Sequence, residues 1–339
     1  MEKLFSNEIV FRGHPDKVCD QISGALLDAL IEQDPDTRAG IEVMGGKSAV
    51  YIAGEITSSA QVDFIAITKR VLEDCGYDSE KLNIVVDISK QSADIALGVD
   101  KQGAGDNGMM FGYACNDTPE MLPPAVVILQ QFAEEYDELR KRDSRFKSDG
   151  KAQITGVYRR DMELAEIKTF TICYQNTEED REEMDSLLQN YARGIARNVA
   201  HVEIQEFLMN PTGRFEVGGF EADVGITGRK IVVDTYQGFA RVGGGNLNGK
   251  DASKVDFSGA HYARQLAKNY ISLEGLHWCE VQIAYAIGKE EPLSIYIDSD
   301  KGVIEAREED FEEGRVEKIR EKYKQEKFEE LAKFGHFTR

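Results

Sequence analysis

Basic side chains and glycines gather in one stretch of this chain, between residues 213 and 256. Residues 229–254 hold five basic residues and two acids, whereas the whole 339-residue chain has a formal net charge of −20. Glycine lets backbone N–H groups approach a ligand closely, and Lys and Arg side chains neutralise phosphate charge. The stretch therefore predicts a site for a strongly anionic small molecule. A solvated turn region with scattered charges is the alternative.

Two glycine motifs look like nucleotide-binding sequences, but each lacks a required part. Residues 103–108 spell G-x-G-x-x-G, yet they neither follow an apolar strand directly nor open a recognisable helix. Residues 244–250 spell G-x-x-x-x-G-K, but Asp251 stands where a Walker loop needs the hydroxyl of Ser or Thr for magnesium. We therefore expect neither a dinucleotide-binding fingerprint nor a P-loop.

The elements that position these residues follow from hydrophobic periodicity. The helices are expected at 14–33, at 58–75 with Ser58 or Ser59 as N-cap, at 123–142, 177–200 and 262–270, and from 305 onward. The strands are expected at 40–57 (a hairpin), 82–88, 153–174 (two strands), 202–208, 230–235 and 280–297 (a pair). Residues 89–120 read as a long polar, glycine-rich passage. Strand–strand–helix groups recur about three times, an order that favours an α+β fold.

The composition limits the class of protein. With 41% hydrophobic and 30% charged residues, the chain is typical of soluble globular proteins. Its acidity argues against nucleic acid and against anionic membrane surfaces as partners. The apolar run 125–129 is too short to span a bilayer. Five isolated cysteines without CxxC spacing suggest buried thiols in a reducing compartment, so we expect a cytoplasmic protein.

Several motifs occur in one order that closely resembles methionine adenosyltransferase, the S-adenosylmethionine synthetase family. The main ones are Gly13-His14-Pro15-Asp16-Lys17, Gly103-Ala104-Gly105-Asp106 and the 213–256 stretch. Supporting segments lie at 54–57, 90–92, 112–114, 210–215 and 285–288. The resemblance runs from residue 4 to about 299 and is thin at 121–148 and 156–205. Because the motifs are independent of one another, the resemblance is highly specific.

The resemblance implies a fold and a division of the chain. The fold is α+β, with three similar domains of β-sheet and helices in a pseudo-threefold arrangement and with interleaved chain segments. Residues 13–116 are expected mainly in the first domain, 121–230 mainly in the second and 231–339 mainly in the third. Residues 1–12 and about 117–240 are split between central segments and segments that contribute to the N-terminal domain.

The resemblance also implies a reaction. In this family the sulfur of methionine attacks the ribose C5′ of ATP, and the whole triphosphate leaves. The triphosphate is then hydrolysed to pyrophosphate and phosphate. Such chemistry depends on aligning the reacting atoms and on stabilising a departing polyanion. The implied substrates are ATP and L-methionine, and the implied assembly is a homodimer or dimer of dimers with active sites at the subunit interface.

The resemblance assigns roles to individual residues. The catalytic positions are His14, Asp106, Lys151, Arg229 and Lys230. His14 lies beside the bond to the triphosphate and can donate to the leaving oxygen. The positions that resemble ATP- or triphosphate-binding residues are His14, Asp149, Lys151, Arg214, Phe215, Asp223, Arg229, Lys230 and Lys250. Arg214 fits a structural partner better than a catalyst.

Methionine-binding and metal-binding positions complete the set. Those that resemble methionine-binding residues are Glu55, Gln91, Asp223, Lys254 and Ile287; Lys254 also resembles a residue of the triphosphate clamp. Asp16 and Asp256, assisted by Glu8, resemble the ligands of two Mg²⁺ ions, a cation that prefers a few carboxylates plus phosphate oxygens. Glu42 resembles the ligand of a K⁺ ion, although alone it would be an ordinary strand acid.

The chain departs from the family pattern in ways that keep other functions open. Arg12 stands where the family usually has Glu, a change expected to lie beside the phosphates and metals. The segment 99–103 is shorter than usual, and the missing part belongs to a mobile loop that gates the site. Asn246 replaces a usual small residue. The alternatives are therefore a non-catalytic or partner-requiring ATP-binding paralog, and a triphosphate hydrolase that no longer makes the sulfonium product.

Overall fold

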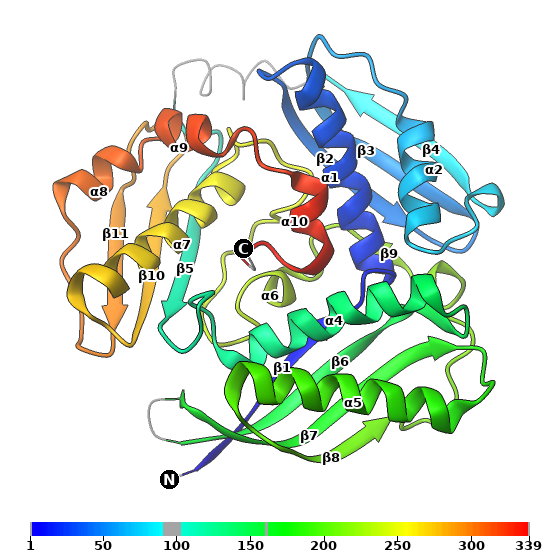
Figure 1. Ribbon diagram of the computed structural model, residues 1–339. Coiled ribbons are helices and arrows are strands. Elements are labelled where there is room, and N and C mark those ends of the chain that lie inside the picture. Colours follow the sequence, from blue (N-terminus) through cyan, green and yellow to red (C-terminus); the bar gives the residue numbers. More distant parts are fainter. Residues whose placement is uncertain (1, 91–102, 160–161, 338–339) are drawn as a thin grey trace.

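The computed structural model describes residues 2–90, 103–159 and 162–337, which form three β-sheets with helices packed against them (Figure 1). The first sheet has the order β4-β3-β2-β9. Its strands are β2 (Arg38–Gly45), β3 (Ala49–Thr57), β4 (Asn83–Ser89) and β9 (Gly225–Ile226). β2 pairs antiparallel with β3 and β9, and β3 pairs parallel with β4. Helices α1 (Pro15–Gln33) and α2 (Phe64–Asp74) cover one face of this sheet.

The second sheet has the order β1-β6-β7-β8. Its strands are β1 (Lys3–Val10), β6 (Phe146–Tyr158), β7 (Leu164–Asn176) and β8 (Ile204–Met209). The first three strands are antiparallel, and β8 runs parallel to β7. Helices α4 (Pro124–Arg142) and α5 (Arg181–Ala200) pack side by side on this sheet (Figure 1).

The third sheet is antiparallel with the order β11-β10-β5. Its strands are β5 (Gly108–Cys115), β10 (Trp278–Tyr285) and β11 (Ser294–Ser299), and its helices are α7 (Val255–Glu274), α8 (Glu308–Glu313) and α9 (Val316–Tyr323). Two short helices, α6 (Ile231–Asp234) and α10 (Phe328–Phe334), lie at the centre, where the three sheets face one another (Figure 1). The predicted α+β fold with three sheets is confirmed.

The chain passes from one sheet to another more than once. β1 begins the chain but pairs with β6, and β5 pairs with β10 although more than 160 residues separate them. One apolar cluster, which includes Val18, Ile22 and Leu266, is shared by the first and third sheets, and a second cluster fills the space under α4 and α5. α1 is buried along most of its length, because it lies between these layers. The residue ranges expected for the three domains stay a prediction.

Four local predictions are wrong. The one helix expected from residue 305 onward is divided into α8, α9 and α10. The helix expected at 58–75 begins at Phe64, because Asp63 caps it and accepts from the N–H groups of Ile65 and Ala66. Ser58 and Ser59 instead donate to Asp34. The polar passage 89–120 contains strand β5, which pairs with β10 in the third sheet.

The fourth wrong prediction is the strand at 230–235, which is the short helix α6. The run Ile231-Val232-Val233 favours a strand by its branched side chains, but β-propensity depends strongly on context, and this segment pairs with no strand of the described residues and ends at Asp234, which contacts Lys17. Among the described residues, no helix is long and apolar enough to cross a membrane.

Gly112 allows α7 to lie against β5, and this contact gives a test of the fold. A Cβ at Gly112 would come 2.0 Å from the backbone carbon of Ala263. We predict that Gly112→Ala destabilises the chain by about 1–3 kcal/mol, because neither backbone can move away freely. Gly194, inside α5, has open space around its Cβ position, so Gly194→Ala should stabilise by roughly 0.5–1 kcal/mol. Thermal or denaturant unfolding measures both variants, and equal stabilities would contradict this account of the packing.

Candidate active site

The N-terminus of α1 forms one side of the candidate site. His14 is its N-cap residue, and its Nδ1 accepts from the N–H of Asp16 at 3.2 Å. Burial, and next the positive charge of Lys230, lower the pKa of His14 to about 4; Lys151 adds to the effect, and Asp16 opposes it. At neutral pH the ring is therefore uncharged. Since Nδ1 accepts, Nε2 carries the hydrogen and can donate to a ligand.

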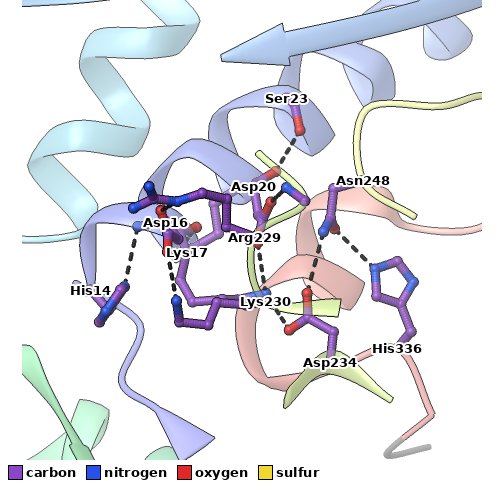
Figure 2. A network of polar contacts seen from close by, with 12 residues as sticks. His14, Asp16, Lys17, Asp20, Ser23, Arg229, Lys230, Asp234, Asn248 and His336 are labelled. Carbon is purple, nitrogen blue, oxygen red and sulfur yellow. Dashed lines mark hydrogen bonds and ion pairs between the residues drawn. The ribbon is translucent and has the colours of Figure 1, made fainter. Parts of the chain in front are cut away.

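The carboxylate of Asp16 binds the loop that follows β9 (Figure 2). Asp16 is fully buried and accepts from the N–H of Ile226 at 2.9 Å, from Arg229 Nε at 2.9 Å and from Lys230 Nζ at 2.6 Å. Burial works against ionisation, but the hydrogen bonds from Lys230, Ile226 and Arg229 outweigh it and lower the pKa of Asp16. This approach requires Gly225, whose Cβ would lie 2.2 Å from the carbonyl oxygen of Pro15.

A second group of predicted residues lines a cavity of about 330 Å³. They are Glu42, Glu55, Asp106, Lys250, Lys254 and Asp256. Lys250 Nζ contacts Asp256 Oδ2 at 2.5 Å, and Lys254 Nζ contacts Glu55 Oε1 at 2.9 Å. The cations on this side, like those around Asp16, are thus neutralised by acids of the same chain. An incoming polyanion would have to replace these acids as their partner.

A separate cavity of about 500 Å³ lies on the other side of the loop after β9. Arg229, Lys230 and Glu8 line it, and so does Gln237, which the sequence motifs did not single out. Gln237 has a φ of +50° and is only 4% exposed. Within the described part of the chain, neither atom of its side-chain amide has a hydrogen-bond partner. A buried, unpaired amide in a left-handed backbone conformation is costly, and such features gather at functional sites.

The expected nucleoside contacts lie along β6 and the segment 214–223. Asp149 is buried and accepts from the N–H of Gly219 at 2.7 Å, and burial raises its pKa. Phe215 is fixed through its backbone, where its carbonyl oxygen accepts from Asn176 at 2.9 Å. Asp223 is exposed, and its negative charge acts to raise the pKa of both His14 and Asp149. Lys151 on β6 is also exposed, and its positive charge acts to lower the pKa of the same two residues.

The remaining predicted residues are less closely gathered. Arg214 is exposed and pairs with Glu216 at 2.7 Å, in keeping with the structural role expected of it. Ile287 is 53% exposed, and its N–H donates to Asn107, the neighbour of Asp106. Gln91 lies outside the described residues, as does most of the shortened segment 99–103.

Glu42, the expected K⁺ ligand, lies on the exposed side of β2. Its Oε2 accepts from the hydroxyl of Thr227, and the amide of Asn246 lies 3.5 Å away. In the described ranges, no group of three or more His, Cys, Asp or Glu side chains is arranged to hold a metal ion.

The expectation that Arg12 lies beside the phosphates and metals is wrong. Arg12 is only 3% exposed, and its guanidinium donates to Gln21, Asp74 and Asp137, on the side of α1 that faces α2 and α4. Two acids thus neutralise its charge. The substitution is absorbed by a buried ion-pair group, because a guanidinium can satisfy several acceptors at once.

Comparison with known proteins identifies the family. Family models for the N-terminal, central and C-terminal domains of S-adenosylmethionine synthetase match residues 2–103, 101–215 and 217–339. The S-adenosylmethionine synthase of Salinispora arenicola is 41% identical, and the match covers 88% of this chain and 82% of the relative. The chain belongs to the S-adenosylmethionine synthetase family. The synthases of Salinispora tropica and a Nocardioides species are each 40% identical with the same coverage. The resemblance inferred from the motifs is confirmed.

The neutral state of His14 predicts how stability depends on pH in this S-adenosylmethionine synthetase. Its pKa is about 4 when folded, compared with an ordinary value of 6.5. Between these values the unfolded chain binds a proton that the folded chain does not, so stability falls as the pH is lowered from 6.5 to 4. We predict that His14→Gln removes this contribution and flattens that part of the profile.

Denaturant unfolding at a series of pH values measures the effect. His201→Gln is the matched control, because His201 is an exposed histidine at the end of α5. A His14→Gln profile with the same slope as the parent protein would contradict the assignment.

Proposed function

We propose that this chain makes S-adenosylmethionine from ATP and L-methionine where the N-terminus of α1 meets the loops between residues 213 and 256. The observation that carries the proposal is the set of cations held in place by acids of the same chain. Arg229 and Lys230 contact Asp16, Lys250 contacts Asp256, and Lys254 contacts Glu55. A triphosphate is the kind of ligand that can engage so many positive side chains at once.

In the proposed reaction, the phosphate oxygens take over the cations that the acids hold in the free protein. His14 Nε2–H donates to the oxygen that leaves C5′, and its lowered pKa keeps it a neutral donor. The departing triphosphate is negatively charged, and so is the transition state of its later hydrolysis. The cations that stabilise this charge are Lys151, Arg229 and Lys230. Because sulfur is already nucleophilic, this chain needs no general base for the attack. Its main contribution is to orient the two substrates.

Asp149, Phe215 and Asp223 are proposed to hold the nucleoside, and Glu55, Lys254, Asp223 and Ile287 to hold methionine. Glu55 suits the ammonium group of methionine and Lys254 its carboxylate. The Glu55–Lys254 contact in the free protein supports this pairing, because the same two charges would separate to receive a zwitterion. Gln91 stays a prediction for the carboxylate.

The acids of the site suit the expected metal ions by their chemistry. Asp16, Asp256 and Glu8 supply carboxylate oxygens, which Mg²⁺ binds together with phosphate oxygens. Two such acids are enough when a triphosphate supplies the other ligands, so a preformed cluster of three is not needed. Mg²⁺ would neutralise charge on the leaving group. Glu42 would hold K⁺, although Thr227 and Asn246 already donate to its carboxylate.

We further propose that two copies of the chain face each other across the first sheet. Met44, Tyr51 and Val85 lie in register across β2, β3 and β4, and each is 42–47% exposed. This apolar row lies on the same side of the sheet as Glu42 and Glu55, because residues two apart on a strand share a face. The predicted residues also divide between two cavities. Both features support an active site that a second copy completes.

The test of the activity is to incubate the purified chain with ATP, methionine, Mg²⁺ and K⁺ and to measure S-adenosylmethionine by mass spectrometry. Product with equal amounts of phosphate and pyrophosphate supports the full reaction. A folded chain that binds ATP without forming product would favour the partner-requiring paralog. Rapid phosphate release from ATP without methionine would favour a hydrolase.

In the same assay we predict that Lys151→Ala lowers turnover by about 100-fold or more, because it removes a charge aimed at the leaving group. Lys147→Ala is the matched control, since Lys147 is exposed on the same strand and its Nζ donates to the carbonyl oxygen of Ser144. Lys147→Ala should keep its activity. Near-normal turnover in Lys151→Ala would remove Lys151 from the catalytic set.

The proposed subunit contact gives a separate prediction. Tyr51→Glu places a charge in the centre of the apolar row, so it should convert the assembly to monomers and lower activity together. Tyr296→Glu is the control, because Tyr296 is similarly exposed on β11, in the third sheet. Sedimentation velocity measures the assembly. A Tyr51→Glu protein that stays dimeric and active would contradict the contact.

A further inference from the structure

Three buried charged residues of this chain have no role in the proposed reaction. Lys17 follows the His14-Pro15-Asp16 motif, and it is only 1% exposed. Its Nζ donates to Asp234 Oδ1 at 2.7 Å and to Asp20 Oδ2 at 3.3 Å, and both acids are buried as well (Figure 2). Burying charges is costly unless their partners are held in place. Residues outside α1 must therefore hold Lys17, Asp20 and Asp234 in place.

The other oxygen of Asp234 leads to the C-terminal end of the described chain. Asp234 Oδ2 accepts from Asn248 Nδ2 at 3.3 Å, which turns the amide oxygen of Asn248 toward His336. That oxygen lies 2.9 Å from His336 Nε2, and His336 is 4% exposed. Because an amide oxygen only accepts, His336 Nε2 must carry the hydrogen.

A second histidine completes the chain of contacts. His336 Nδ1 lies 3.4 Å from Nε2 of His261, on α7. Burial, and then the neighbouring His261 and Lys17, lower the pKa of His336 well below its usual value, so its ring is neutral and Nδ1 accepts. His261 therefore donates to His336, His336 to Asn248, and Asn248 to Asp234. We call this series of hydrogen bonds the relay; in each of them the donor lies on the His261 side. Lys17 donates to the other oxygen of Asp234, which is the last acceptor.

The relay ends at the backbone that carries two of the proposed triphosphate-binding cations. The N–H of Asp234 donates to the carbonyl oxygen of Lys230 at 2.8 Å, and the N–H of His336 donates to that of Asp234 at 2.8 Å. Asp20 Oδ1 accepts from the N–H of Gly228 at 3.0 Å. The N–H of Gly228 and the carbonyl oxygen of Lys230, the residues before and after Arg229, are thus bound by Asp20 and Asp234 of the same buried group.

We propose that His336 is a positioning residue, which holds the Gly228–Lys230 backbone, through Asn248 and Asp234, in the conformation that binds a nucleoside triphosphate. The inference rests on the proposed function in one respect, namely that Arg229 and Lys230 bind the triphosphate. It concerns ATP and not methionine, because the backbone that the buried group binds is that of Gly228 and Lys230, whereas the proposed methionine-binding pair consists of Glu55 on β3 and Lys254 at the N-cap of α7. His336 itself touches neither substrate.

The side chain at position 336 can be changed so that the relay is either kept or broken. Glutamine can donate to Asn248 with its nitrogen and accept from His261 with its oxygen, as the neutral ring does, whereas leucine can do neither. We expect His336→Leu to weaken binding of the Mg²⁺ complex of the β,γ-imido analogue of ATP by about tenfold, the size of one lost buried hydrogen bond. His336→Gln should bind within about twofold of the parent protein. The KM for methionine should change in neither variant.

Phe337→Leu is the matched control for packing. Phe337 is the next residue and is equally buried; its ring stacks on Tyr236 with centroids 5.2 Å apart and meets the ring of His261 edge-on at 5.1 Å, but its side chain has no donor or acceptor to offer the relay. It should lower stability without changing affinity for the ATP analogue. Equal affinities in His336→Leu and His336→Gln, or the same loss in Phe337→Leu, would overturn the proposal.

A spectroscopic measurement on the parent protein keeps the proposal testable if His336→Leu does not fold. Nitrogen NMR of ¹⁵N-histidine protein should find His336 neutral at pH 7 with its hydrogen on Nε2. A cationic ring, or a hydrogen on Nδ1, would overturn the relay. If the parent protein does not bind the ATP analogue, the proposed function fails instead, and the NMR result still decides whether the relay exists.

Discussion

The buried carboxylate of Asp16 is the contact on which the arrangement of the candidate site depends. It lies at the start of α1, out of contact with water, and accepts from two cations and one backbone N–H of a loop more than 200 residues away in the sequence. A buried charge is tolerated only when such partners are present, since removing one leaves an uncompensated charge. The position of the loop after β9 is therefore set by α1. The site exists only once the first sheet and the central helices have come together.

The same principle explains how an acidic protein can carry a cationic site. In the described residues Arg229 and Lys230 pair with Asp16, Lys250 with Asp256 and Lys254 with Glu55, so the local charge is low although the proposed ligand is a polyanion. Arg12 extends this pattern away from the site, where Asp74 and Asp137 neutralise it. The charges are thus organised before any ligand arrives. In the proposed function, binding exchanges one set of partners for another, which costs less than bringing mobile cations together.

The relay from His261 to Lys17 passes beside the two short central helices, since Asp234 ends α6 and His336 follows α10. α6 and α10 are short and would not be stable alone, because a helix of four to seven residues forms too few internal hydrogen bonds. They are held by buried polar contacts and by the stacking of Phe337 on Tyr236. The end of the described chain therefore contributes to the interior at the meeting point of the three sheets. Such a position couples the C-terminal segment to the loop that follows β9.

The sequence by itself determined the family, the α+β class and most of the long elements. The periodicity of residues 14–33 specified α1, and the ordered motifs from Gly13 to Asp256 specified the chemistry, because both are local or nearly local patterns. Tertiary structure decided which side chains meet. The run Ile231-Val232-Val233 favours a strand, but in the folded chain the segment is helical and its last residue, Asp234, pairs with Lys17. Asn248 occupies an unspecified position of the 244–250 run and His336 lies outside every motif, and the burial that gives them their roles arises only when distant segments pack together.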